Sequence, residues 1–146
     1  MKRYLGTAHR TVGIATLALF AVTGQIMDHL DLDHMAVDSA VRLLYRSRHI
    51  YLLFAGLVNL AVGMRFVLPI SGTGSRVAVI GSILMLVAPI PLTVAFFVEP
   101  PRLGQVTLPA ILGIFGSYVG LLFYCVGIWR LRVRDALAPE HADETK

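Results

Sequence analysis

Charged side chains are scarce in this sequence. Asp, Glu, Lys and Arg make up 15% of its 146 residues, whereas a typical soluble domain contains about 25%. Hydrophobic residues make up 56%, and the mean hydropathy is +0.72. So few charges are atypical of a protein whose surface faces water, and the composition predicts a protein that lies largely in lipid.

Cysteine and the familiar catalytic motifs are also scarce. The single cysteine, Cys125, excludes an internal disulfide and a zinc site built from several cysteines. It lies within an apolar stretch, where we expect it to act as a small packing residue. The chain contains no GxSxG, P-loop or HExxH motif. We therefore expect no independent enzymatic activity.

What the sequence does contain is four long apolar stretches. Each has about the 17–25 residues that a helix needs to cross a bilayer. They predict an all-α integral membrane bundle of four transmembrane helices, over residues 8–28, 49–69, 76–98 and 107–130. These spans form a single membrane domain, residues 1–136, followed by a flexible polar tail, residues 137–146. In the first loop, a cap at Asp38 or Ser39 predicts a short interfacial helix through about Tyr45.

Basic residues gather beside both termini, and the net charge of the chain is +4. Four spans place the two termini on one side of the membrane. The positive-inside rule then predicts a plasma (bacterial inner) membrane protein with both termini in the cytoplasm. Because the bases lie beside apolar segments, we expect them to meet anionic lipid headgroups and not nucleic acid. The flanking bases are Lys2, Arg3, Arg10, Arg130, Arg132 and Arg134.

Glycines recur at heptad spacing within the spans. Seven residues make almost two helical turns, so each set lies on one helix face, where small residues allow close packing of helices. We expect these faces to pack within the bundle; the alternative is self-association through the glycines of the last span. The sets are Gly6 and Gly13, Gly56 and Gly63, and Gly113, Gly120 and Gly127.

Few polar residues interrupt the spans. No Asp, Glu, Lys or His lies near the middle of a span, which disfavours a proton- or ion-coupled transporter. Asn59 is expected to hydrogen-bond to a neighbouring helix. Pro89 and Pro91 remove backbone donors and predict a kink near mid-membrane. Together, Asn59 and this kink favour a small carrier or channel as one alternative function.

The histidines suggest a second alternative, a b-type haem. If the first two spans are antiparallel neighbours, His29 and His49 reach a similar height at the outer side. Two imidazoles on facing helices can ligate a haem, and glycines nearby leave room for the porphyrin. A second haem would require His9 at the other end of the first span.

The first loop is rich in metal-ligating side chains. Mixed carboxylate and imidazole ligands suit zinc, manganese or iron, and the segment therefore suggests a divalent metal site. Its candidate ligands are Asp28, His29, Asp31, Asp33 and His34.

Residues 9–29, HRTVGIATLALFAVTGQIMDH, resemble the first transmembrane helix of PepSY-associated membrane proteins. The matching positions are His9, Arg10, Gly13, Thr23 and Gly24. Some of those proteins are similar to haem-containing ferric reductases that use helix-end histidines as ligands. The resemblance therefore implies His9 and His29 as haem ligands. The first loop is too short to hold the periplasmic domain of that group, so the resemblance covers this helix alone.

Small size, short loops and the lack of catalytic motifs favour one function above the others. We expect a non-catalytic accessory or assembly subunit of a larger membrane complex, surrounded by lipid and bound to other membrane subunits or to itself. The b-type haem protein and the small carrier or channel are the alternatives.

Overall fold

The computed structural model describes residues 2–30, 39–65, 73–99 and 107–137. These residues form helices and no strand. Four helical segments are long and apolar enough to cross a membrane: Tyr4–His29, Ser39–Met64, Ser75–Val98 and Leu108–Arg130. The chain is therefore an all-α, multi-pass membrane protein built as a four-helix bundle, as the sequence predicts. The helices are α1 (Lys2–His29), α2 (Ser39–Met64), α3 (Thr73–Val87), α4 (Pro89–Val98) and α5 (Leu108–Leu137).

The second span begins earlier than predicted. α2 begins at Ser39 and not at residue 49, so the separate interfacial helix predicted through Tyr45 is wrong: that segment is the first part of α2. The reason is that the inward-facing stripe of Tyr45, Arg48 and Leu52 keeps helical spacing across the predicted boundary. The predicted end of this span, residues 66–69, lies outside the described residues.

The structure divides the third span into α3 and α4 at Ala88, beside the two prolines; the predicted kink angle stays a prediction. Pro89 and Pro91 have no N–H to donate to the carbonyls of Met85 and Val87, four residues earlier. The backbone stays helical at Ala88, with φ −53° and ψ −36°, and the Leu92 N–H donates to the Ala88 carbonyl over 3.3 Å. The third span is thus one helical rod with two hydrogen bonds missing.

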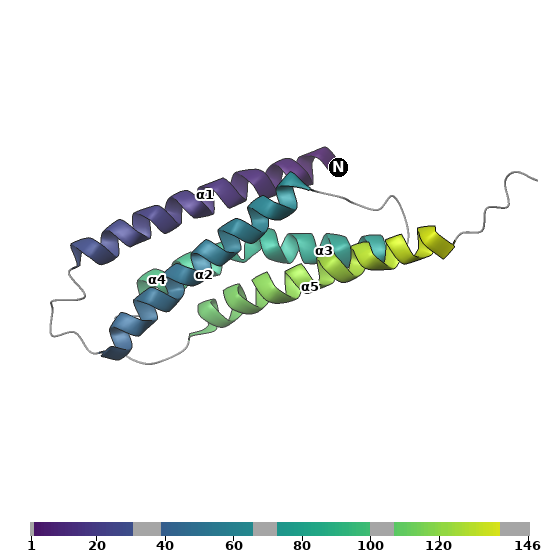
Figure 1. Cartoon of the computed structure of the whole chain (residues 1–146). Helices are drawn as coiled ribbons and strands as arrows, with labels where there is room; N and C mark the ends of the chain where they lie inside the picture. The colour runs from purple at the N-terminus through teal and green to yellow at the C-terminus, as the bar shows by residue number, and fades with distance from the viewer. Residues whose placement is uncertain (1, 31–38, 66–72, 100–106, 138–146) are drawn as a thin grey trace, which may run out of the picture.

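The helices pair into two hairpins (Figure 1). In the first, α1 and α2 touch backbone to backbone at glycines. A Cβ added to Gly13 would lie 2.7 Å from the Leu60 nitrogen, and one added to Gly63 would lie 2.7 Å from the Arg10 nitrogen. A real side chain at either place would force the helices apart. The glycines therefore fix how α1 lies on α2.

The second hairpin consists of α3 and α4 packed on α5. A Cβ added to Gly81 would lie 2.5 Å from the Gly120 carbonyl oxygen, and one added to Gly113 would lie 3.0 Å from the Leu92 nitrogen. The glycine face of α5 is thus filled from within the chain, in agreement with the expected packing inside the bundle.

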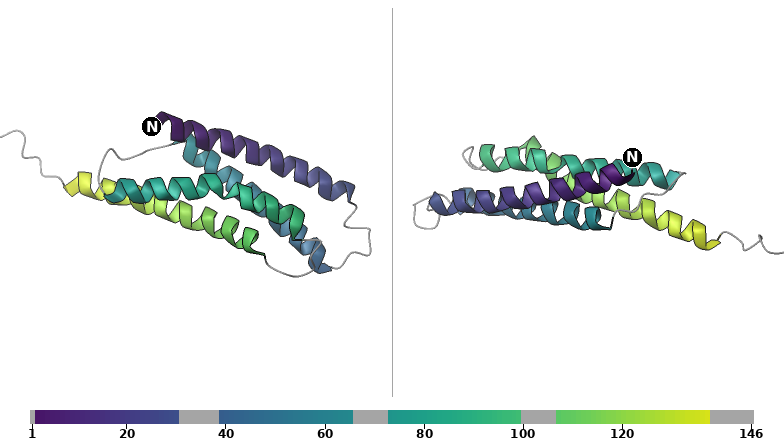
Figure 2. Two further views of the ribbon diagram at one scale, coloured as in Figure 1. Left: turned by 180° about the vertical axis from the view of Figure 1, so that it is seen from behind. Right: turned by 90° about the horizontal axis from the view of Figure 1, so that it is seen from above.

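The two hairpins meet through side chains. Their shared apolar core consists of Leu52 and Ala55 of α2 with Leu92 and Phe96 of α4, all 1% exposed or less. In the front view of Figure 1 and the back view of Figure 2, α1 and α5 lie at opposite edges of the bundle. α1 begins and α5 ends at the same end of the molecule (Figure 1).

Candidate functional site

Buried polar side chains form two clusters where the hairpins meet. The first, here called the His9 cluster, consists of His9, Asn59, Ser82 and the carbonyl of Met85. The second, here called the Glu99 cluster, consists of Arg48, Glu99, Thr107 and the N–H of Ala110. Asn59 and Arg48 are both on α2, about 16 Å apart along its axis. The apolar core of Leu52 and Ala55 lies between them.

The His9 cluster joins α1, α2 and α3. The His9 Nδ1 lies 2.8 Å from the Asn59 Oδ1, and the His9 Nε2 lies 2.7 Å from the Ser82 Oγ. The Asn59 Nδ2 donates to the carbonyls of Ala55 and Met85, over 2.9 Å each. His9, Asn59 and Ser82 are 1% exposed or less. Each of these bonds is therefore shielded from water.

The bonds of Asn59 set the tautomer of His9. Because its Nδ2 donates to two carbonyls, the Asn59 Oδ1 is the acceptor that faces His9. The His9 Nδ1 must then carry a proton. In a neutral imidazole the Nε2 is left as an acceptor, and it receives the hydroxyl proton of Ser82.

Asn59 also repairs the break in the third span. The Met85 carbonyl is the one that the missing N–H of Pro89 leaves without its helical partner. Asn59 donates to this carbonyl from α2. A polar group that would be costly to leave unpaired in a membrane is thereby satisfied. Pro89 and Asn59, from different hairpins, therefore act together: the proline leaves the Met85 carbonyl without a helical donor, and the asparagine supplies one.

The order of atoms in this cluster matches that of a Ser–His–Asn catalytic triad, in which the histidine takes the hydroxyl proton. A triad needs its nucleophile open to a substrate carbonyl. Ser82 is 0% exposed and lies within α3 (Thr73–Val87), nine residues after its start and five before its end. No substrate reaches the Ser82 Oγ in this conformation. The cluster acts here as a tie between helices.

The Glu99 cluster contains a buried ion pair. The Arg48 Nε donates to the Glu99 Oε2, and the two side chains are 6% and 0% exposed. The Glu99 Oε1 accepts the N–H of Thr107 over 3.2 Å, the N–H of Ala110 over 3.3 Å and the hydroxyl of Thr107. Glu99 thus caps the N-terminus of α5, where the helix dipole favours a negative charge.

Sequence reasoning missed this ion pair because it placed Arg48 and Glu99 just outside the spans. Fifty-one positions separate them, so no local pattern links them. One signal was present. Glu99 is the only Asp or Glu between residues 39 and 134. A lone carboxylate in so long an apolar region requires a basic partner.

The two predicted haem ligands of the outer side, His29 and His49, have different surroundings in the structure. The His49 ring stacks on Phe20, with centroids 3.9 Å apart, and its Nδ1 lies 3.0 Å from the Thr23 Oγ. His29 is exposed and lines a surface hollow on another side of α1, with Val22, Gln25, Ile26 and Leu30. Of the third candidate, His9, both ring nitrogens are engaged by Asn59 and Ser82. Haem binding stays a prediction.

The predicted metal ligands lie mostly outside the described residues. This applies to Asp31, Asp33 and His34. Asp28 and His29 are described and exposed at the end of α1. Within the described ranges there is no group of three or more His, Cys, Asp or Glu side chains that could hold a metal ion.

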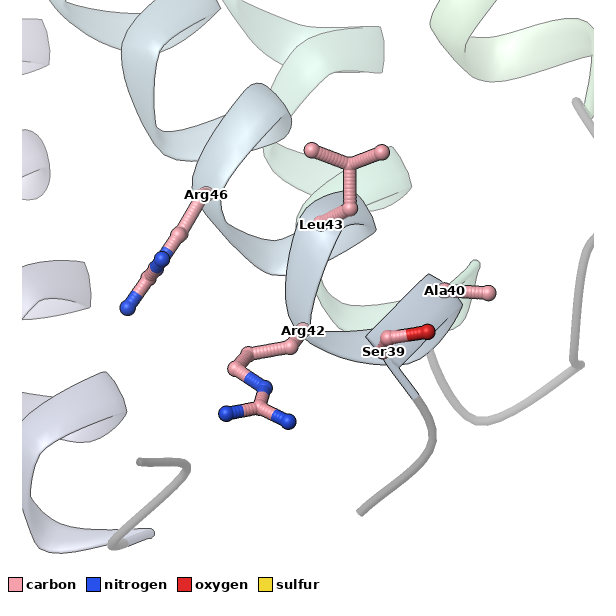
Figure 3. A pocket seen from close by; sticks show the side chains of 5 residues that line it. All are labelled: Ser39, Ala40, Arg42, Leu43 and Arg46. Carbon is pink, nitrogen blue, oxygen red and sulfur yellow. The ribbon is translucent and has the colours of Figure 1, made fainter. Parts of the chain in front are cut away.

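A basic surface hollow lies at the start of α2. Figure 3 shows Arg42 and Arg46 extending from the helix beside Ser39. Ala40 and Leu43 complete its lining. Both arginines make further interactions, so the hollow does not offer two unpaired cations to a ligand.

No protein-family model, curated protein or solved structure matches the chain. The resemblance of residues 9–29 to PepSY-associated proteins therefore stays a prediction.

Proposed function

We propose that this protein is a non-catalytic accessory or assembly subunit of a larger membrane complex. The observation that carries the proposal is the peripheral position of α1. Of the most apolar part of α1, 17% is buried inside the chain, compared with 39%, 39% and 28% in the other three spans. A helix that uses so little of its surface within its own bundle is available to a partner.

The outward face of α1 suits contact with another helix. Its exposed positions include Thr11, Ala15, Ala18 and Ala21, which are all small. In lipid, helices associate by close packing, and small residues let two backbones approach. The partner in this proposal is a transmembrane helix of another subunit.

The interior supports a non-catalytic role. Among the described residues, every buried side-chain nitrogen or oxygen has a hydrogen-bond partner. The two polar clusters are thus complete without a ligand or substrate.

We further propose that the membrane is the bacterial inner membrane, with both termini in the cytoplasm. Exposed arginines gather at the end of the bundle that holds His9, as the positive-inside rule requires of the cytoplasmic side. Anionic headgroups there would bind these side chains. The Glu99 cluster then lies at the outer side. The exposed arginines at this end are Arg10, Arg65, Arg76 and Arg130, whereas Arg46 is the exposed arginine described at the other end.

Purification from native membranes in a mild detergent tests the proposal. We expect a defined partner to copurify at fixed stoichiometry. Ala18→Trp, on the outward face of α1, should remove that partner and leave the fold intact. Leu112→Trp, at an exposed position of α5, is the matched control and should retain it. A monodisperse lone protein in mild detergent would count against the proposal.

A further inference from the structure

The helices pack more closely within each hairpin than between the two hairpins. Within each hairpin, helix backbones meet at glycines, and an added Cβ would lie 2.7 Å or less from a backbone atom at Gly13, Gly63 and Gly81. Between the hairpins, the contacts are made by side chains: those of the apolar core and the two polar clusters, of Val62 packed with Met85 and Tyr124, and of the stacked rings of Phe54 and Tyr118. Side-chain contacts can part and re-form without a change in backbone shape. Each hairpin is therefore the rigid unit, and their interface is where motion is easiest.

The Glu99 cluster can be divided cleanly between the hairpins. Glu99, Thr107 and Ala110 all belong to the second hairpin, and three of the four donors to the Glu99 carboxylate come from it. Arg48 alone belongs to the first. If the hairpins part at this end, Glu99 remains hydrogen-bonded to the N-terminus of α5.

Arg48 has its own alternative environment. It lies nine residues from the start of α2, near the end of the bundle, and its guanidinium is 5.9 Å from the ring of Tyr51 on the same helix. A long arginine side chain at this depth can reach the headgroups and water. Most buried ion pairs are costly to break because one partner is left as an unpaired charge in the apolar interior. Separation at this end avoids that cost for both Arg48 and Glu99.

The His9 cluster behaves in the opposite way. His9 and Asn59 belong to the first hairpin, whereas Ser82 and the Met85 carbonyl belong to the second. Separation at this end would leave Ser82 and the proline-exposed carbonyl of Met85 unpaired in a fully buried place. Each such group is costly in a membrane. This end therefore stays closed.

We propose that the Arg48–Glu99 pair is a latch: the two hairpins part at the Glu99 end while they pivot on the His9 cluster. Opening exposes the apolar core at Leu52 and Phe96 to water from the outer side. The motion is a rigid-body rocking of two units about a fixed contact. It requires no unfolding of any helix.

Distances between pairs of spin labels in lipid nanodiscs test the latch. With Cys125→Ser as background, one pair of labels sits at Leu43 and Phe97, near the Glu99 end, and a second pair at Met64 and Ile80, near the His9 end. All four positions are exposed. Arg48→Met should lengthen or broaden the first distance and leave the second unchanged.

Thr107→Val is the matched control. It weakens the cap on α5 within the second hairpin and retains the ion pair, so both distances should stay as in the wild type. Unchanged distances in Arg48→Met would overturn the proposal. A similar increase of both distances would also overturn it, because it would indicate general loosening and not a pivot.

A second measurement does not depend on the fold of the Arg48→Met variant. In the Cys125→Ser background with Arg48 and Glu99 intact, a cysteine at Leu52 should react slowly with a bulky polar maleimide in nanodiscs, because the latch opens at times. A cysteine at Ala78, which is equally buried but near the pivot, should react at least about tenfold more slowly. Equal rates at the two positions would overturn the proposal.

Discussion

At the scale of single residues, every side chain of the two clusters has an assigned donor or acceptor role. Asn59 is central, because it contacts His9, a carbonyl of its own helix and the carbonyl that Pro89 leaves free. Glu99 is central to the cluster at the other end of the bundle, since it contacts both Arg48 and the start of α5. These two residues therefore have more effect on the bundle than their size suggests.

The tautomer of His9 is the first prediction. We expect a neutral ring with its proton on Nδ1, because the Asn59 Oδ1 is an acceptor and the Ser82 hydroxyl donates to Nε2. Nitrogen-15 shifts of labelled His9 in bilayers measure this directly. Asn59→Leu should remove the preference for Nδ1, whereas Thr23→Val, next to His49, should not change it. A proton on Nε2 in the wild type would contradict the assignment.

Substitutions in the same cluster should differ in cost. Ser82→Ala leaves one buried group, the His9 Nε2, without a donor and should lower the free energy of unfolding by about 1–3 kcal/mol. Asn59→Leu leaves the His9 N–H and the Met85 carbonyl unpaired, and each unpaired group costs about 1–3 kcal/mol. Denaturation in mixed micelles measures both. Equal effects would indicate that Asn59 does not hold the Met85 carbonyl.

At the scale of elements, glycine determines how helices pair and proline determines where one is interrupted. α3 lies on α5 because Gly81 and Gly120 let their backbones meet. The break at Ala88 follows from Pro89 and is repaired by Asn59 of another helix. Helix pairing and helix repair thus depend on different residues.

Two single substitutions compare a glycine that has no room for a side chain with one that has room. A Cβ at Gly81 would lie 2.5 Å from the Gly120 oxygen and the Tyr124 nitrogen, which are backbone atoms that cannot move aside. Gly81→Ala should therefore destabilise the protein by about 1–3 kcal/mol. A Cβ at Gly116 would lie 3.4 Å from the Ala88 Cβ, so Gly116→Ala should be nearly neutral. Thermal unfolding in detergent compares the two, and equal melting temperatures would contradict the packing described.

Sequence patterns predicted the elements better than the contacts between them. Four apolar runs, the prolines and the glycine spacing gave the spans, the break and the close faces, because these are local or periodic properties. The pattern misplaces the start of α2 because a charged residue such as Arg48 predicts a loop, whereas the structure buries Arg48 against Glu99. The partners of His9 come from α2 and α3, and only the fold brings them near.

At the scale of the whole molecule, the bundle is two glycine-packed hairpins joined by a polar cluster at each end of an apolar core. This arrangement fixes the register of the hairpins, since a shift along the axis would break hydrogen bonds at both ends. Our proposal for its function adds an orientation, with the Glu99 cluster at the outer side.

Reporter fusions test that orientation. A fluorescent protein fused after residue 146 should fluoresce, and alkaline phosphatase fused there should be inactive, because both termini are expected in the cytoplasm. Replacing Arg65 and Arg76 by Gln should weaken this preference. An active phosphatase at the C-terminus would contradict the proposed orientation.

The central claim is that polar contacts between the hairpins hold the bundle together, and a double-mutant cycle on the ion pair tests it most directly. Arg48→Met and Glu99→Gln should each lower the free energy of unfolding by about 1.5–3 kcal/mol, since each removes the charge-assisted hydrogen bond between the two hairpins. In the double variant both charges are gone, and Gln can still accept from Thr107. We predict that the double variant is more stable than the sum of the single losses implies, by about 1.5 kcal/mol or more. Additive losses, within about 0.5 kcal/mol, would show that Arg48 and Glu99 do not join the hairpins.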